Sequence, residues 1–216
     1  MPVHIADALI LRTYAYGESD RLVVFLTRDR GKKRGVAKNA RQSRRRFGAA
    51  LEPMTVGRVS YVERERRDLV FLNYVEPVRS PLGDVPSISS EGLGHVEYFA
   101  ELIDEWAQEG DPNETLFRLG ASMVDAVAAG VPIDPLARYF EYWLLKLQGV
   151  YEPDPAASQD ARSFLAAART CSPLGLGKVL ATRPVMRELE QSHRTLFGRH
   201  LEKDLKSVRV LRALRG

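Results

Sequence analysis

The chain has 216 residues, enough for one large domain or two small ones that each bury a core. Its formal net charge is +4, and no apolar run approaches the roughly 18 residues of a membrane span, so no such span is expected. The single cysteine, Cys171, excludes an internal disulfide framework. The N-terminus lacks the features of a secretory signal, and together with the single cysteine this predicts a cytoplasmic protein.

Five strand patterns occupy the first 80 residues. Apolar, β-branched and aromatic runs alternate with turn-forming residues, and the runs are Ala6–Tyr16, Arg21–Thr27, Arg34–Ala37, Met54–Val62 and Leu69–Val75. Five short strands with one longer polar interruption fit a small closed barrel better than an open sheet. Gly57, inside the fourth run, predicts a bulge or a sharp bend.

Helical periodicity follows a proline-punctuated linker. Apolar residues recur at helical spacing in Glu91–Gln108, Glu114–Ala129 and Pro135–Gln148, and Gly130 and Gly149 stand where helix ends are expected. Three successive helices with short connections predict a bundle. Beyond it we expect a helix near Ala161–Arg169 and one long helical pattern from Arg183 onwards. The fold class is therefore α+β, with a barrel in residues 1–80 and a mostly α-helical domain in residues 81–216.

The charges are unevenly distributed. Residues 1–80 hold 17 Lys and Arg against 9 Asp and Glu, residues 81–155 hold 3 against 14, and residues 156–216 hold 12 against 5. A basic first block favours polyanions, whereas the acidic middle block is expected to repel them. The alternative is that these blocks are ordinary solvated faces.

The segment Arg28–Arg46 carries the strongest local signal. Ten of its nineteen residues are Lys or Arg, and only Asp29 is acidic. Such a run repels itself and is usually retained by something anionic, although a solvated loop is the alternative. No base-reading motif accompanies it, so sequence-tolerant contact with a phosphate backbone is predicted. With two neighbours on the first strand, the predicted contact residues are Arg12, Tyr14, Lys32, Lys33, Arg34, Lys38, Arg41, Arg44, Arg45 and Arg46.

Exposed aromatic side chains would be needed to stack on bases. Tyr14 and Tyr16 share a strand face with Arg12, which makes them the preferred candidates. The remaining candidates are more often core residues in a small barrel, and they are Phe47, Tyr61, Phe71 and Tyr74.

We expect no metal site, cofactor or catalytic residue. Cys171 stands alone, and the histidines are scattered, with His193 and His200 expected on the surface. The segment Gly175–Lys178 lacks the rest of a phosphate-binding loop, and no activated nucleophile is apparent. The acidic cluster of Glu101, Asp104, Glu105, Glu109 and Asp111 has the pattern of a solvent-facing helix surface rather than that of a cation site.

A second basic stripe marks the C-terminal pattern. Arg199, Lys203, Lys206, Arg209 and Arg212 recur at three- and four-residue steps beside an apolar side. Such a stripe suits DNA or an acidic partner peptide, and an ordinary amphipathic helix is the alternative.

Several of these segments occur in a recognisable order. They are Gly17–Asp20 followed by RLVVFLT, Gly31 with GVAKNARQSRRRFGAALEP, the run Trp143–Tyr151, and the terminal HLEKDLKSVRVL. In this order, over almost the whole chain, they resemble the RecO family of bacterial DNA repair proteins. The resemblance implies an N-terminal OB-fold and a helical C-terminal domain. Family members often carry paired cysteines for zinc after the segment that matches Tyr151, but residues 152–182 contain only Cys171, so zinc is not expected.

The resemblance also implies a function. The implied function is that of a DNA repair and recombination mediator that is not an enzyme. Such a mediator would be cytoplasmic and associated with the nucleoid. Such a protein binds single- and double-stranded DNA through the residues given above and anneals complementary strands. With RecR, it helps to load RecA onto strands coated by single-strand-binding protein. The acidic C-terminal tail of that protein would suit Arg199, Lys203, Lys206 and Arg209.

Two other functions remain open at this point. One is an RNA- or ribosome-associated barrel protein with no repair role, which competition between DNA and RNA oligonucleotides would distinguish. The other is a nuclease, disfavoured because the basic domain has no carboxylate cluster.

Overall fold

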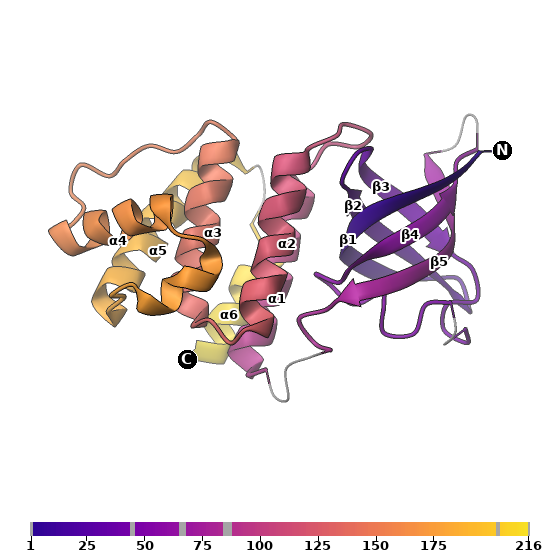
Figure 1. Ribbon diagram of the computed structural model, residues 1–216, viewed down its shortest axis with the longest axis horizontal. Helices are drawn as coiled ribbons and strands as arrows, with labels where there is room; N and C mark the ends of the chain where they lie inside the picture. The colour runs from indigo at the N-terminus through magenta and orange to yellow at the C-terminus, as the bar shows by residue number, and fades with distance from the viewer. Residues whose placement is uncertain (1, 44–45, 65–67, 84–87, 202–203, 216) are drawn as a thin grey trace.

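The structure is a computed structural model that describes residues 2–43, 46–64, 68–83, 88–201 and 204–215. Figure 1 shows a β-barrel beside a group of helices, with α1 and α2 lying between the barrel and the other helices. The α+β fold class is confirmed, because a closed five-stranded barrel precedes a helical region. The predicted domain boundary at residues 80–81 falls in the connection between β5 and α1 and stays a prediction.

The barrel has the strand order β1-β2-β3-β5-β4, and pairing of β1 with β4 closes it. β3 and β5 run parallel, whereas the other neighbouring strands are antiparallel. This is the expected OB-type barrel. The strands occupy the predicted positions, and they are β1 (Val3–Tyr16), β2 (Asp20–Thr27), β3 (Gly31–Ala37), β4 (Val56–Val62) and β5 (Leu69–Arg79).

Local irregularities bend the strands so that the barrel closes. The register of β1 against β2 shifts between Ile10 and Arg12, and that of β4 against β5 shifts between Val56 and Gly57. A Cβ atom at Gly57 would lie 2.5 Å from the Glu76 carbonyl oxygen, so a side chain does not fit there. The bend predicted at Gly57 is confirmed.

The helical region begins with the three predicted helices. Side chains of Ser89, Asn113 and Ser158 accept hydrogen bonds from the first turns of α1, α2 and α4. Gly130 and Gly149 follow α2 and α3 with positive φ, as expected of helix ends. None of the described helices is long and apolar enough to span a bilayer. The elements are α1 (Ser90–Trp106), α2 (Glu114–Ala128), α3 (Ile133–Leu147), α4 (Gln159–Thr170), the 3-10 helix η1 (Pro173–Lys178), α5 (Arg183–His200) and α6 (Lys206–Arg215).

The single long helical pattern expected after Arg183 is wrong. α5 ends at His200, and a separate helix, α6, begins at Lys206. The backbone N–H groups of Lys206 and Ser207 donate to the Glu101 carboxylate at 3.1 and 2.7 Å, so a side chain of α1 caps the start of α6. Because the cap comes from a residue about one hundred positions earlier, the local pattern did not reveal it.

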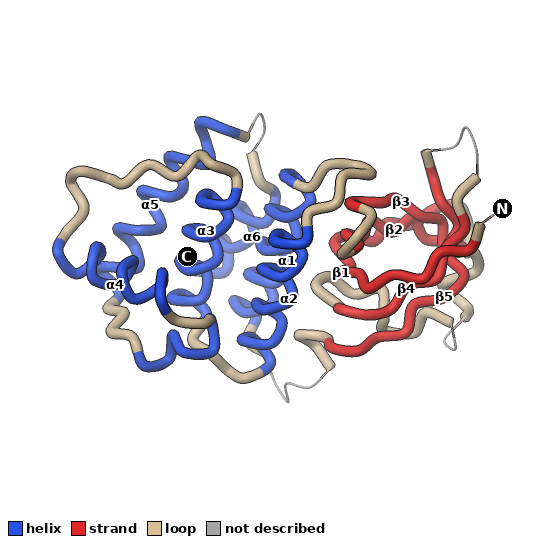
Figure 2. Tube along the Cα trace, turned by 45° about the horizontal axis from the view of Figure 1, so that its top comes forward, coloured by secondary structure: helices blue, strands red, loops and turns tan. Residues whose placement is uncertain are grey.

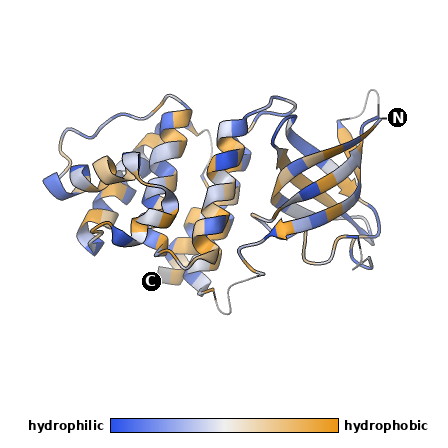
Figure 3. Cartoon of the chain, in the orientation of Figure 1, coloured by the Kyte–Doolittle hydropathy of each residue, from blue (hydrophilic) through white to orange (hydrophobic). Residues whose placement is uncertain are grey.

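Two apolar clusters hold the molecule together. One fills the barrel and includes Phe25, Phe47 and Tyr61. The other fills the helical region and extends onto the outer surface of the barrel through Leu9 and Leu26. Figure 2 shows the same arrangement from another direction, with the strands (red) against α1 and α2. Both strands and helices alternate hydrophobic and hydrophilic residues along their length (Figure 3), as expected for elements with one buried face.

Candidate nucleic-acid interface

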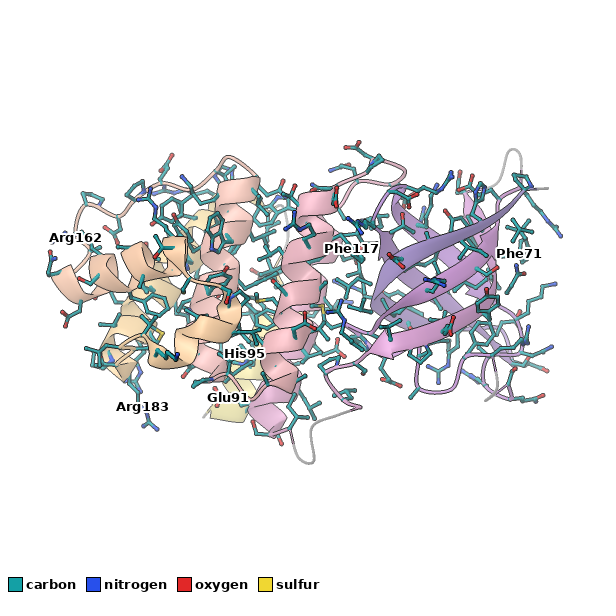
Figure 4. The ribbon with its side chains drawn as sticks, in the orientation of Figure 1. Phe71, Glu91, His95, Phe117, Arg162 and Arg183 are labelled. Carbon is teal, nitrogen blue, oxygen red and sulfur yellow. The ribbon has the colours of Figure 1, made fainter. Side chains whose placement is uncertain are left out.

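One outer face of the barrel is covered by helices. Leu9 and Leu11 of β1 and Val24 and Leu26 of β2 belong to the same apolar cluster as α1 and α2. Figure 4 shows Phe117 of α2 on the side that faces the barrel. OB-folds commonly bind oligonucleotides on the face formed by strands 2 and 3. Here α1 and α2 cover the apolar part of the β1–β2 face.

Arg12 lies at this covered face, inside a cluster of carboxylates from α1. Its guanidinium is 2.9 Å from Asp104, 3.2 Å from Glu101 and 3.4 Å from Glu105. Burial by itself would lower the pKa of Arg12, but Asp104, Tyr14 and Glu101 outweigh it and raise that pKa. Lys32 joins the cluster through a 3.1 Å ion pair with Asp104. Both predicted DNA contacts are therefore engaged by α1.

Three further ion pairs connect the barrel with the helices. Arg34 contacts Glu109 at 2.8 Å, Arg28 contacts Glu114 at 2.5 Å, and Arg79 contacts Asp125 at 2.6 Å. The interpretation of the acidic cluster as a solvent-facing surface is wrong for Glu101, Asp104 and Glu105, because these mostly buried carboxylates face Arg12 of the barrel. Part of the basic first block is thus neutralised by part of the acidic middle block across one interface.

Lys33 is also paired, but at the opposite side of β3. Its ammonium group lies 2.8 Å from a Glu63 carboxylate oxygen. This hydrogen bond lowers the pKa of Glu63, although partial burial opposes the shift.

The loop between β3 and β4 presents the remaining described cations of the predicted site. Lys38 and Arg41 are exposed and Arg46 is half-buried. Arg41 donates to the Glu18 carbonyl at 3.0 Å, and Arg46 donates to the Lys38 carbonyl at 2.7 Å. Neutral oxygens hold these guanidinium groups in place, and no carboxylate among the described residues forms an ion pair with any of the three. Arg44 and Arg45 lie outside the described residues.

Tyr14 lines a cleft of about 420 Å³ between the barrel and the helices. It is 45% exposed, as is Tyr16. The cleft also contains Arg21 and Lys206 together with Glu52, Glu97 and Glu101, so its charge is mixed. A polyanion gains little from such a surface.

The other aromatic candidates separate into two pairs. Phe47 and Tyr61 are buried in the barrel core. Phe71 and Tyr74 are only partly covered, and Figure 4 shows Phe71 outside the barrel wall, away from the helices. The Arg64 guanidinium lies 4.4 Å from the centre of the Phe71 ring. Sequence reasoning missed Arg64, because the 63–68 loop has three arginines and three acidic residues and therefore no net positive charge.

The described residues of the predicted partner-binding stripe do not form one continuous stripe, because Arg199 lies on α5 and Lys206 and Arg209 lie on α6. Arg199 is paired with Glu152 at 3.1 Å, and Lys206 lines the cleft beside Tyr14. Arg209 lines a groove of about 200 Å³ between α5 and α6. Lys203 lies outside the described residues.

A buried polar network stabilises the helical region. Glu141 accepts hydrogen bonds from Tyr98 at 2.8 Å and Arg138 at 2.7 Å, and it lies 2.9 Å from Nδ1 of His193. Burial opposes the charge of Glu141, but these partners outweigh it and lower its pKa. The expected surface position of His193 is wrong, because this side chain is buried against Glu141.

In the part of the chain that the structure describes, no group of three or more His, Cys, Asp or Glu side chains has the arrangement of a metal site. Residues 152–182, the least patterned segment, contain α4 and η1, and Cys171 caps the end of α4. Partial burial raises the pKa of the Cys171 thiol.

Comparison with known proteins places these features in a family. Residues 1–81 match the family model described as Recombination protein O N terminal, and residues 90–161 match Recombination protein O C terminal. Similar curated proteins are named DNA repair protein RecO. The one from Koribacter versatilis is 42% identical over 150 residues, which cover 69% of this chain and 59% of that protein.

Others are less similar. The protein of that name from Anaeromyxobacter sp. (strain K) is 41% identical over 145 residues, 66% of this chain and 55% of the relative. The one from Geobacter metallireducens is 38% identical over 143 residues, 66% of this chain and 57% of the relative. The matches thus span less than two thirds of the length of these relatives. With both halves of the chain matched in order, the barrel and the helical region identify it as a member of the RecO family.

Proposed function

We propose that this chain acts in DNA repair and recombination as a mediator that binds single- and double-stranded DNA and anneals complementary strands. With RecR, it helps to load RecA onto strands coated by single-strand-binding protein. The role requires binding and delivery rather than a catalytic step. Family membership supports the repair role, and the charge distribution of the barrel supports contact with DNA.

The observation that carries the proposal is the β3–β4 loop. Arg41 and Arg46 are held by neutral oxygens, Lys38 lies near the Phe71 ring, and none of the three forms an ion pair with a carboxylate among the described residues. In contrast, Arg12 and Lys32 are paired with α1, and Arg34 is paired with Glu109, just after α1. Release of counterions from a phosphate backbone favours cations that have no internal partner. The interface proposed for DNA is therefore the end of the barrel that carries the β3–β4 loop.

The test is to replace Lys38, Arg41 and Arg46 together with Gln and to measure binding to single-stranded oligonucleotides at several salt concentrations. Each lost phosphate contact lowers the slope of log K against log salt by about 0.7, so a decrease of about 2 is expected, independent of sequence. The matched control replaces Arg162 of α4 and Arg183 and Arg187 of α5, which are all exposed. Figure 4 shows Arg162 and Arg183 on the side of the helices away from the barrel. An unchanged slope in the loop variant, or an equal decrease in the control, contradicts the proposal.

The groove between α5 and α6 supports a second part of the proposal. Its apolar lining includes Phe197, Leu201 and Val208, and its charged lining residues are Arg194, Arg209, Arg212 and Asp204. An acidic segment that ends in apolar residues would complement this groove, because its carboxylates suit the arginines and its apolar end suits the apolar lining. We therefore assign the tail of single-strand-binding protein to this groove, with Arg209 retained from the predicted stripe.

A further inference from the structure

The barrel has a second outer face, formed by β4, β5 and the first residues of β1, that carries apolar and aromatic side chains. Val3 and Ile5 of β1 are 61% and 59% exposed, and Tyr74 of β5 is 37% exposed. In the strand pairing, Val3 lies opposite Val62, which lies opposite Phe71, and Ile5 lies opposite Ser60, which lies opposite Tyr74. These residues therefore form two adjacent rows across the three strands.

A bulge places both aromatic rings on this face. Residues three apart in a regular strand point to opposite sides, so Phe71 and Tyr74 would be separated by the barrel wall. The register shift between Ser60 and Tyr61 leaves Asn73 as an extra residue on β5, and its amide donates to Ser60 at 3.2 Å. Leu72 and Val75 point into the core instead. Since Phe71 and Tyr74 face β4 residues two apart, they lie about 7 Å from each other.

Cations from two loops surround the Phe71 ring. The Arg64 guanidinium, from the β4–β5 loop, is 4.4 Å from the ring centre, and the Lys38 ammonium, from the β3–β4 loop, is 5.5 Å away. Arg46 accepts a backbone hydrogen bond from Val75 at 3.1 Å, so the basic loop is attached to the same strand. A flat aromatic surface is thus combined with charges that suit phosphates.

We propose that Phe71 and Tyr74 form a platform on which two successive unpaired bases stack, while Lys38 and Arg64 move from the Phe71 ring to the adjoining phosphates. This proposal rests on the proposed DNA-binding function and specifies its substrate as single-stranded DNA with accessible bases. The bases of a duplex are already stacked on one another, so the platform gives single strands an advantage that phosphate contacts alone do not provide. The charges favour a nucleic acid over a neutral apolar protein surface.

The test compares an ordinary oligonucleotide with an abasic one of equal length, which keeps the phosphates and lacks the bases. Phe71→Leu and Tyr74→Leu retain apolar volume and remove the aromatic rings. For the ordinary oligonucleotide, the expected loss of affinity is about 10-fold for each variant and about 100-fold for both together. Binding to the abasic oligonucleotide and the salt dependence should be unchanged. Tyr14→Leu, which removes the competing aromatic candidate, should bind both oligonucleotides like the wild type.

Phe71→Trp provides a direct signal of stacking. Its added fluorescence should be quenched by the ordinary oligonucleotide and not by the abasic one, with the wild type, which has only Trp106 and Trp143, as the reference. Salt-dependent binding of the wild type to both oligonucleotides with equal affinity would overturn the platform while leaving the proposed function intact. Unchanged affinity of the double variant would also overturn it and leave this face to protein contacts. Salt-independent binding of the wild type would overturn both proposals.

Discussion

At the scale of single residues, Glu141 is the group on which the buried polar side chains of the helical region depend. Its neighbours are the buried side chains of Tyr98, Arg138 and His193. An ionised carboxylate can only accept hydrogen bonds, so Nδ1 of His193 carries the hydrogen that faces it. Glu141 is also the closest carboxylate to the buried Arg138 guanidinium. Loss of this negative charge therefore leaves a buried cation with poor compensation.

Glu141→Gln is expected to lower the free energy of unfolding at pH 7 by about 3 kcal/mol. Because the pKa of Glu141 is lowered from 4.5, its charge contributes stability that is fully present above pH 4.5 and is lost as the pH falls through the lowered value. The difference between variant and wild type should therefore shrink below pH 4.5. Urea unfolding at pH 7 and at acidic pH measures this difference in the free energy of unfolding. Glu152→Gln, at an exposed position, serves as the control. A difference that does not change with pH would refute this account.

Sequence patterns located the residues of this network but did not connect them. Tyr98, Glu141 and His193 each lie on a different helix. Helical periodicity indicates which residues face inward on one helix, but not which residues of other helices they meet. A lone histidine in a polar sequence context was therefore interpreted as a surface residue.

At the scale of elements, the strands and first helices were predictable because their periodicity and end signals are local. Turn residues separate the five strands, and Gly130 and Gly149 end two helices. The break between α5 and α6 was not predictable, since the Glu101 carboxylate that caps α6 belongs to α1. This break also creates the groove that is lined by Arg209.

The groove gives an element-scale prediction. Arg209→Glu combined with Arg212→Glu should weaken binding of a peptide with the acidic, apolar-ended character of the single-strand-binding protein tail by about tenfold or more. Fluorescence anisotropy with a labelled peptide measures this effect. Arg199→Glu is the matched control, since Arg199 is on α5 but pairs with Glu152 outside the groove. If the control loses as much affinity as the double variant, the tail binds elsewhere.

At the scale of the whole molecule, opposite charges connect the barrel to the helices. Arg12 is the centre of this interface, because Glu101, Asp104 and Glu105 all contact its guanidinium. Burial would raise the pKa of Glu101, but the hydrogen bonds that it accepts from Ser207 and Lys206, together with the charge of Arg12, outweigh burial and lower that pKa. One arginine thus holds β1 to α1, and Glu101 in turn holds α1 to α6.

Arg12→Ala should lower the free energy of unfolding by about 2 to 4 kcal/mol at neutral pH, because three mostly buried carboxylates lose their shared cation. Urea unfolding measures it. Arg28→Ala, whose partner Glu114 is exposed, should have a much smaller effect. Arg12→Ala should retain the salt dependence of DNA binding, since its side chain is engaged by α1. A stable Arg12 variant with a reduced salt slope would instead support Arg12 as a direct DNA contact.

The sequence by itself determined the α+β class, the barrel, most helix positions and the concentration of positive charge in Arg28–Arg46, because composition and local periodicity encode these features. Only the tertiary structure decided which of those charges are available. Packing of α1 and the segment that follows it against β1 and β3 pairs Arg12, Lys32 and Arg34 with carboxylates, and leaves Lys38 and Phe71 on the side away from the helices. The physical reason is that an ion pair depends on distance in space, which a sequence pattern does not specify for residues seventy to ninety positions apart.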